Sequence, residues 1–242
     1  MNLIIDAGNT KVKLAIFKKA EIIHLETVAT YDFVEAVKKT FKDFPQIKSA
    51  IISSVGSLSK EQINIMAVFC DFYELSNASK VPFKNSYASP QTLGVDRLAL
   101  ATAAFYYKPH SNILVIDAGT CITYDMVNDF DEYLGGAISP GVQMRYNAMH
   151  DQTAKLPLLE KKELLDYIGN TTENCIHSGV VYGVSHEIDG VIDLYKGRFK
   201  DLTIILTGGD ALFLSKRLKN TIFADSKFLL KGLNYLLEYN KH

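Results

Sequence analysis

The sequence has 242 residues, of which 48% are hydrophobic and 22% are charged, a composition typical of a folded globular protein rather than a disordered chain. Its 26 basic and 27 acidic side chains leave a net charge of −1, which argues against direct binding to nucleic acid. No apolar run approaches the ~20 residues of a membrane span, and no basic residue opens the chain as in a signal peptide. Three scattered cysteines argue against a disulfide framework, so we expect a cytoplasmic protein.

Apolar runs and alternating patterns predict the elements of the first half of the chain. Residues 3–5 form a short apolar run, typical of a buried strand, and Asp6 follows soon after it. Beyond Gly8, apolar residues alternate with other residue types, which predicts a second strand. The later patterns predict, in chain order, a strand at 21–28, a helix at 33–41, a strand at 50–53, a helix at 60–70, a loop at 80–93 and a helix at 96–107.

The second half of the chain repeats this opening. Residues 114–116 are again an apolar run, followed by Asp117-Ala118-Gly119-Thr120 and by a second alternating stretch. The helix predicted at 172–195 contains Gly179 and Gly183. We expect close packing to compensate for these two residues, because glycine destabilises a helix by about 1 kcal/mol relative to alanine. The elements predicted after the repeat are a strand at 133–138, a helix at 172–195, a strand at 203–206 and a helix at 227–239.

Strands that alternate with helices are typical of an α/β fold. No linker or low-complexity stretch interrupts the sequence. The repeated strand–turn–strand unit predicts two similar domains, residues 1–107 and 108–242, facing one another across a cleft.

Each Asp-Ala-Gly turn combines a carboxylate with exposed backbone N–H groups. Glycine allows the backbone to turn sharply, and the lysines after Gly8 add positive charge, so such a turn can hold phosphate oxygens. Asp6 would itself repel phosphate and therefore suits Mg²⁺ or the water around it. One such turn alone is better explained as an ordinary hairpin turn, but two of them, each after an apolar strand, favour nucleotide binding.

Three other glycine motifs leave two interpretations open. Thr207–Asp210 follows an apolar strand and precedes a helix, and it is either an ordinary strand-to-helix turn or a close backbone approach to a flat or phosphorylated ligand with Asp210 as N-cap. In Gly94–Arg97, Asp96 is either a helix cap or a base that accepts a hydroxyl proton, with Arg97 holding an anion. Gly135–Gly141 either serves strand crossing or leads a helix N-terminus to an anionic group.

Together these motifs make the chain resemble the type III pantothenate kinases, a family of the acetate and sugar kinase/Hsc70/actin superfamily. The resemblance extends from Asp6 to Asp210. The paired turns mark the superfamily, and the Gly94–Arg97 motif, the Gly135–Gly141 motif and the short length narrow it to the family. The resemblance implies two ribonuclease H-like (actin-like ATPase) domains around a nucleotide cleft. It also implies ATP-dependent phosphorylation of pantothenate to 4′-phosphopantothenate, the first step of coenzyme A biosynthesis.

The resemblance implies roles for individual residues as well. Asp96 matches the proton acceptor, Asp117 the ligand of a monovalent cation, K⁺ or NH₄⁺, and Asp6 a partner of Mg²⁺ through water. The residues that match pantothenate contacts are Tyr87, Gly94, Val95, Asp96, Arg97 and Thr172. The residues that match ATP contacts are Asp6, Ala7, Gly8, Asn9, Thr10, Lys11, Val12, Lys13, Gly119, Thr120, Gly208 and Gly209. Family members are typically homodimers, with the pantothenate pocket close to the dimer contact.

Two other functions are compatible with these motifs. A kinase of the same fold could act on another small alcohol or on a sugar. The chain could also be a non-catalytic ATP-binding regulatory protein related to actin, although the presence of Asp96 argues against that function.

Overall fold

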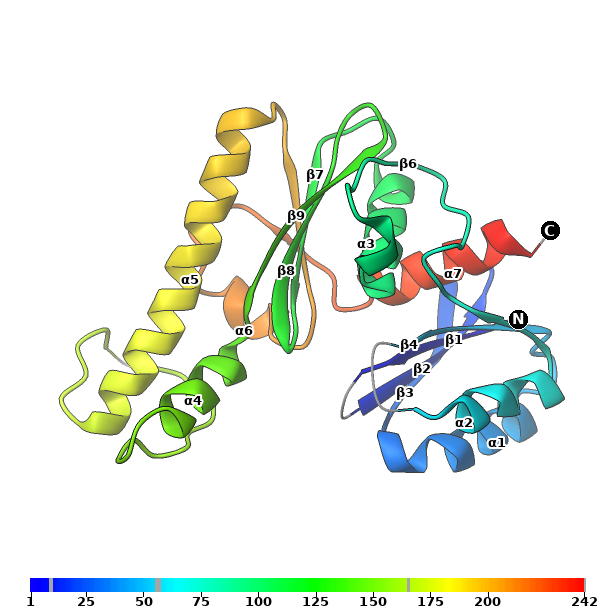
Figure 1. Cartoon of the computed structure of the whole chain (residues 1–242), viewed down its shortest axis with the longest axis horizontal. Coiled ribbons are helices and arrows are strands. Elements are labelled where there is room, and N and C mark those ends of the chain that lie inside the picture. The colour runs from blue at the N-terminus through cyan, green and yellow to red at the C-terminus, as the bar shows by residue number, and fades with distance from the viewer. Residues whose placement is uncertain (9–10, 55–57, 165, 242) are drawn as a thin grey trace. The chain divides into compact units, whose positions relative to one another are not determined.

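The computed structural model describes residues 1–8, 11–54, 58–164 and 166–241. Contacts within it group the chain into two compact units, which are described separately below (Figure 1). The first unit comprises Met1–Pro109, Asp131–Tyr133 and Lys227–His242, and the second comprises His110–Phe130 and Leu134–Ser226. This grouping places the C-terminal helix in the first unit, whereas the predicted division after residue 107 places it in the second domain. The predicted domain boundary stays a prediction.

The first unit is built on a five-stranded mixed sheet in the order β3-β2-β1-β4-β5. Strand β2 is antiparallel to β1 and β3, while β4 is parallel to β1 and β5. Strand β1 is therefore central and buried, and it ends beside the turn that carries Gly8. The strands are β1 Asn2–Ala7, β2 Lys11–Lys18, β3 Glu21–Ala29, β4 Ser49–Ser54 and β5 Asp71–Glu74.

The second sheet repeats this order as β9-β8-β7-β10-β11, with the short strand β6 added beside β9. Strand β7 is antiparallel to β8 and parallel to β10, so β7 occupies the central place that β1 has in the first sheet. The internal repeat predicted from the sequence is thus a repeat of topology. The strands are β6 Lys84–Asn85, β7 Ile113–Ala118, β8 Cys121–Val127, β9 Glu132–Pro140, β10 Thr203–Thr207 and β11 Phe223–Ala224.

Helices cover both faces of the first sheet. Leu3 and Ile5 of β1 pack in one buried cluster with Phe33 and Val37 of α1 (Phe33–Asp43). A strand points alternate side chains to opposite faces, so Asn2, Ile4 and Asp6 face the other side. There α7 (Phe228–Asn240) contacts β1, and the side-chain amide of Asn2 donates to Asn234 Oδ1 at 2.8 Å.

Helix α3 (Val95–Tyr107) packs against α7 in the first unit. Two short helical segments, α2 (Lys60–Asn64) and the 3₁₀ turn Ile65–Val68, replace the single helix predicted over 60–70. Helix α2 begins at a capping box between Ser59 and Gln62, in which each side chain satisfies a backbone N–H of the other.

The second unit buries one face of its sheet under α4 (Val142–Asp151), α5 (Thr172–Arg198) and α6 (Ala211–Ser215). Figure 1 shows α5, the longest helix, running along this sheet. The buried residues of α5 follow helical spacing, from Ile176 through Val184 to Ile192. Apart from its chain neighbours and the nearby backbone of α5, a Cβ added at Gly179 or Gly183 would meet no described atom within 4 Å. The expected close packing at these glycines is therefore wrong for this single chain.

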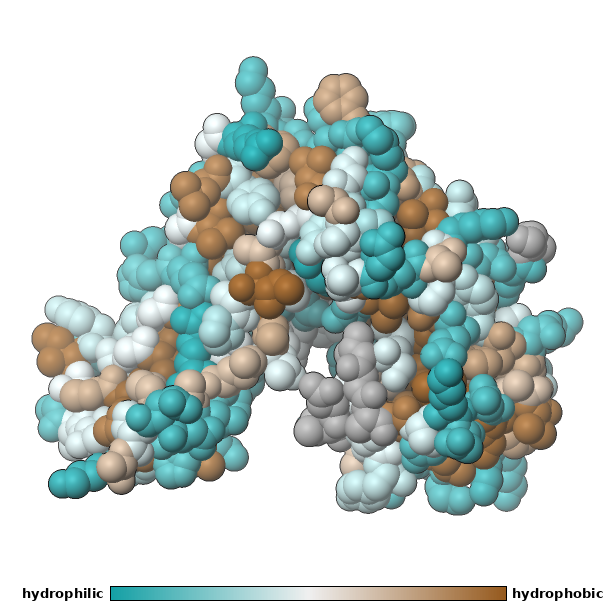
Figure 2. Space-filling view, in the orientation of Figure 1, coloured by the Kyte–Doolittle hydropathy of each residue, from teal (hydrophilic) through white to brown (hydrophobic). Residues whose placement is uncertain are grey.

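Hydrophobic side chains on the face drawn in Figure 2 lie in several separate groups among hydrophilic ones. No helix in the described part of the chain is both long enough and apolar enough to cross a membrane.

Gly232 sets the distance between α3 and α7. A Cβ at this position would lie closer than 3.0 Å to the carbonyl of Ala99, a separation that real Cβ atoms essentially never show. We expect Gly232→Ala to lower the free energy of unfolding by about 1–3 kcal/mol, because the helix pair must separate. Urea unfolding followed by circular dichroism measures this change.

Gly190→Ala is the matched control for Gly232→Ala. Apart from its chain neighbours and the nearby backbone of α5, a Cβ at Gly190 would meet no described atom within 4 Å, so this substitution should stabilise the protein by about 0.5–1 kcal/mol through helix propensity. Equal stability changes in the two variants would contradict the packing role of Gly232.

Candidate active site

Asp6 occupies the carboxyl end of the central strand of the first unit. Strand pairing sets it directly opposite Lys13, whose Nζ lies 3.3 Å from Asp6 Oδ2. The backbone N–H of Gly8 donates to the carbonyl of Lys11 at 3.1 Å and closes the turn. Ala7 and Val12 are buried beneath this turn, and Lys11 is exposed. Asn9 and Thr10, also predicted to contact ATP, lie outside the described residues.

The Gly94–Arg97 motif forms the first turn of α3. Gly94, not Asp96, is the N-cap residue of this helix, so the expectation of Asp96 as a possible cap is wrong. The Asp96 carboxylate instead accepts the backbone N–H of Arg97 at 2.9 Å. Arg97 is buried, and its guanidinium carbon lies 5.7 Å from the ring centroid of Tyr87. The structure thus brings together two residues that the sequence proposed for the same substrate.

The pKa of Asp96 is raised above the ordinary value of an aspartate, chiefly because burial disfavours the charged form. The N–H of Arg97 counteracts this effect, while the negative charge of Asp6 adds to it. Asp6 and Asp96 are therefore electrostatic neighbours within the first unit. A carboxylate with raised proton affinity beside a second carboxylate suits a division of roles between proton acceptor and cation partner.

In the second unit, the Asp117 turn lies against the Gly208-Gly209 motif. Strand β10 is parallel to β7 with Thr207 opposite Asp117, and the backbone N–H of Asp210 donates to the carbonyl of Ala118 at 2.9 Å. Gly208 has φ +95°, and a Cβ there would clash with the Ala118 carbonyl and the Asp117 carboxylate. Only glycine suits this close approach in the left-handed region.

Gly135–Gly141 contains glycines with different structural roles. A Cβ at Gly136 would collide with the backbone of Tyr124 on β8, so this position serves the close approach of β8 and β9. Gly141 is the N-cap residue of α4, and its N–H donates to the Thr120 carbonyl at 3.1 Å. The second half of the motif therefore packs against the Asp117–Thr120 turn.

Asp210 makes an ion pair with Lys161. Asp210 is the N-cap residue of α6, as predicted, although its side chain makes no capping hydrogen bond. The Lys161 ammonium also lies 5.6 Å from the ring centroid of Phe213. The loop before α5 is thereby tied to the Gly208-Gly209 motif.

Thr172 lies on the exposed first turn of α5. The hydroxyl of its neighbour Thr171 accepts the backbone N–H of Asn174 at 3.2 Å and caps the helix. Capping therefore accounts for Thr171, and Thr172 is the better candidate for a substrate contact. Thr172, Gly119, Thr120, Gly208 and Gly209 all belong to the second unit with Asp117, whereas Tyr87, Gly94, Val95, Asp96 and Arg97 belong to the first with Asp6.

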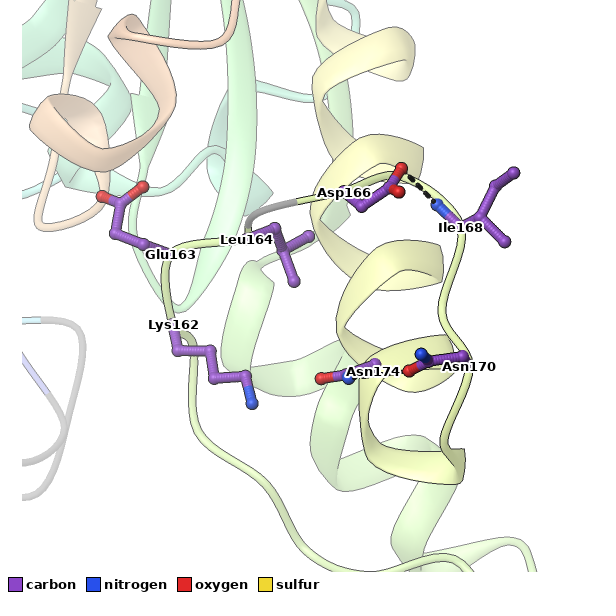
Figure 3. Close-up of a pocket in the computed structure, with 7 residues that line it drawn as sticks. All are labelled: Lys162, Glu163, Leu164, Asp166, Ile168, Asn170 and Asn174. Atoms are coloured by element: carbon purple, nitrogen blue, oxygen red, sulfur yellow. Dashed lines mark hydrogen bonds between the residues drawn. The ribbon is translucent and has the colours of Figure 1, made fainter.

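A cavity of about 430 Å³ lies beside the start of α5. Figure 3 shows that its lining comes from the loop before this helix and from the helix itself. Asp166 Oδ1 accepts the backbone N–H of Ile168 at 3.1 Å and orders this loop. The residues that line the cavity are Lys162, Glu163, Leu164, Asp166, Ile168, Asn170 and Asn174. None of them is among the residues predicted for the active site.

The described residues contain no group of three or more His, Cys, Asp or Glu side chains that could hold a metal ion. Asp6 and Asp117 each bring carboxylate oxygens to a turn, and such hard donors suit Mg²⁺ or an alkali cation. A cation at either residue would complete its coordination with backbone carbonyls, water or ligand oxygens.

Proteins of known structure share this fold. A Baf family protein from Campylobacter jejuni matches with a TM-score of 0.67 and 22% identity, covering 99% of this chain and 98% of its own. A glucokinase from an Antarctic psychrotroph matches with a TM-score of 0.52 and 14% identity, covering 98% of each chain. The α/β architecture with two mixed sheets is thus that of sugar kinases and actin-like ATPases, as the sequence predicted.

Sequence comparison extends the match beyond the fold. The type III pantothenate kinase of Christiangramia forsetii is 47% identical over 241 residues, covering 100% of this chain and 99% of its own. That of Flavobacterium psychrophilum is also 47% identical over 241 residues and is covered completely. A family model described as type III pantothenate kinase matches residues 2–194. The chain therefore belongs to the type III pantothenate kinase family.

Proposed function

We propose that the chain transfers the γ-phosphate of ATP to the primary hydroxyl of pantothenate, giving 4′-phosphopantothenate and ADP in the first step of coenzyme A biosynthesis. Full-length similarity to pantothenate kinases supports this activity. The observation that carries the proposal is the cluster in the first unit, where Asp96 is the neighbour of Asp6 and Arg97 packs against Tyr87.

Asp96 accepts the proton of the pantothenate hydroxyl in this mechanism. The hydroxyl oxygen forms a bond to the γ-phosphorus, and the bond from that phosphorus to the bridging oxygen of ADP breaks. The raised pKa of Asp96 strengthens it as a base. Arg97 binds the carboxylate or another polar group of pantothenate, with Tyr87, Gly94, Val95 and Thr172 as further contacts.

The two Asp-Ala-Gly turns bind ATP. Backbone N–H groups and Lys13 of the first turn, with Gly119 and Thr120 of the second, neutralise and orient phosphate oxygens, which is the main requirement of phosphoryl transfer. Gly208 and Gly209 allow the backbone to approach the adenosine side closely. Mg²⁺ supplies charge neutralisation when bound, with Asp6 holding it through water, and Asp117 holds K⁺ or NH₄⁺.

The proposal includes a homodimer as the working form. Exposed apolar side chains of the second unit offer material for such an interface, among them Tyr167, Ile168 and Leu194.

A coupled assay with ATP, Mg²⁺ and K⁺ tests the acceptor. We expect ADP release that depends on pantothenate, with mass spectrometry detecting the phosphorylated product. Glucose and glycerol serve as alternative acceptors in parallel reactions. Phosphorylation of a sugar without phosphorylation of pantothenate would refute the proposal.

Asp96→Asn tests the base. We expect kcat to fall by about 10²- to 10⁴-fold, the usual contribution of a positioned general base. ATP affinity, measured by calorimetry, should change little. Asp43→Asn is a matched control, because Asp43 is exposed at the end of α1 in the same unit. Normal turnover of Asp96→Asn would assign the base to another group.

Replacing K⁺ by Na⁺ at constant ionic strength and constant Mg²⁺ tests the monovalent cation. We expect kcat to fall in Na⁺, because Na⁺ loses its hydration shell less readily to carboxylate and carbonyl oxygens. Asp117→Asn should lower activity and remove the difference between the two salts. Full activity of the unmodified chain in Na⁺ alone would contradict the cation role of Asp117.

A further inference from the structure

The turn between β9 and α4 is a structural support of the Thr120 turn. The N–H of Gly141 donates to the Thr120 carbonyl at 3.1 Å. A Cβ at Gly141 would come closer than 3.0 Å to the carbonyl oxygens of Gly119 and Thr120. Because the two backbones touch in this way, any displacement of Gly141 moves the turn proposed to bind phosphate.

Arg145 holds this support in place from the first turns of α4. Its Nε donates to the carbonyl of Pro140 at 3.0 Å, and its guanidinium bonds Glu187 Oε2 on α5 at 2.7 Å. One guanidinium thus binds the residue before Gly141 and a distant helix at the same time. Such a fork fixes geometry in a way that a single-point donor cannot.

Glu187 links three elements through its two oxygens. Oε2 accepts from Arg145 on α4, and Oε1 accepts the hydroxyl of the buried Tyr124 on β8 at 3.4 Å. Burial alone would raise the pKa of Glu187, but the Ser139 hydroxyl and the Arg145 guanidinium outweigh it and bring the pKa below its ordinary value. The carboxylate therefore stays charged at neutral pH and keeps its partner.

We infer that Arg145 and Glu187 are positioning residues for ATP binding, acting through Pro140 and Gly141 on Thr120. The inference rests on the proposed role of the Thr120 turn. The side chains of Arg145 and Glu187 are only 21% and 32% exposed, so water screens this ion pair less than it screens a fully exposed one. A purely structural role, in which the pair only holds α4 against α5, is the competing explanation.

Glu187→Gln keeps the shape of the side chain and removes its charge. We expect KM and the dissociation constant for ATP to rise by roughly tenfold, with KM for pantothenate changing much less. Arg145→Lys should show the same effect in weaker form, because an ammonium cannot reach Pro140 and Glu187 with the same fork. Calorimetric titration of ATP needs no acceptor, so it tests this inference even if the acceptor is not pantothenate.

Asp189→Asn is the matched control on the same helix. Asp189 accepts backbone N–H groups of Lys219 at 2.9 Å and Asn220 at 3.0 Å, so it stabilises the second unit without touching Gly141. We expect this variant to lose stability and to keep its ATP affinity.

Amide hydrogen exchange of the variants, followed by NMR, gives a local readout. Exchange at Gly141 should accelerate in Glu187→Gln and Arg145→Lys, whereas exchange at Lys219 and Asn220 should accelerate in Asp189→Asn. If Glu187→Gln does not fold, the milder Arg145→Lys decides the question. ATP affinity that is unchanged in the variants, or lowered equally in Asp189→Asn, would overturn the inference.

Discussion

Burial of the central strand in each sheet is the constraint on which the candidate site depends. Strands β1 and β7 each have partners on both sides and side chains almost wholly excluded from water. Each strand keeps only one partly accessible side chain near its end, Asp6 in one and Asp117 in the other. A carboxylate fixed to a rigid, buried strand has little freedom to reorganise, which is what charge stabilisation in catalysis requires.

The two turns share a plan but differ in their electrostatics. In the first unit, Asp6 is balanced by Lys13, which sits opposite it across the strand pair. In the second, the residue opposite Asp117 is Thr123, and the carboxylate lies against the backbone of Gly208. The first turn thus places a lysine ammonium beside its carboxylate, whereas the second places a glycine backbone beside it. The repeat in sequence therefore supports two chemically different turns.

Local patterns in the sequence were sufficient to predict most of the framework. The apolar runs before Asp6 and Asp117 indicate the central strands because burial on both faces requires uninterrupted apolar residues. Strand β5 and the two-residue strands β6 and β11 are not predicted, since such short segments carry no periodicity. The caps at Gly94 and Gly141 also escape prediction, because glycine has no side chain that signals the cap.

Contacts between distant residues explain the parts of the site that the sequence does not reveal. Arg145 and Glu187 are 42 residues apart, and Lys161 and Asp210 are 49 apart. Nothing near Arg145 distinguishes it from an exposed helix residue, since its partners lie on β9 and α5. Only the fold of the second unit makes it a neighbour of the Thr120 turn. Thr171 and Thr172 have identical side chains next to one another, and the sequence does not tell them apart. A local contact does so in the structure, because only the Thr171 hydroxyl accepts the N–H of Asn174 that caps the helix.

The environment of Asp96 shows how opposing effects can produce a useful base. Full neutralisation by Arg97 would lower the proton affinity of the carboxylate and weaken it as a proton acceptor. The Arg97 guanidinium lies near the Tyr87 ring, its backbone N–H donates to Asp96, and its charge offsets only part of the effect of burial on the pKa of Asp96. Burial and the charge of Asp6 then leave the pKa raised. The charge and the backbone N–H of Arg97 lower the proton affinity of Asp96, but burial and the charge of Asp6 outweigh both effects. An arginine suited to an anionic group and a proton-accepting aspartate can therefore be neighbours in one motif.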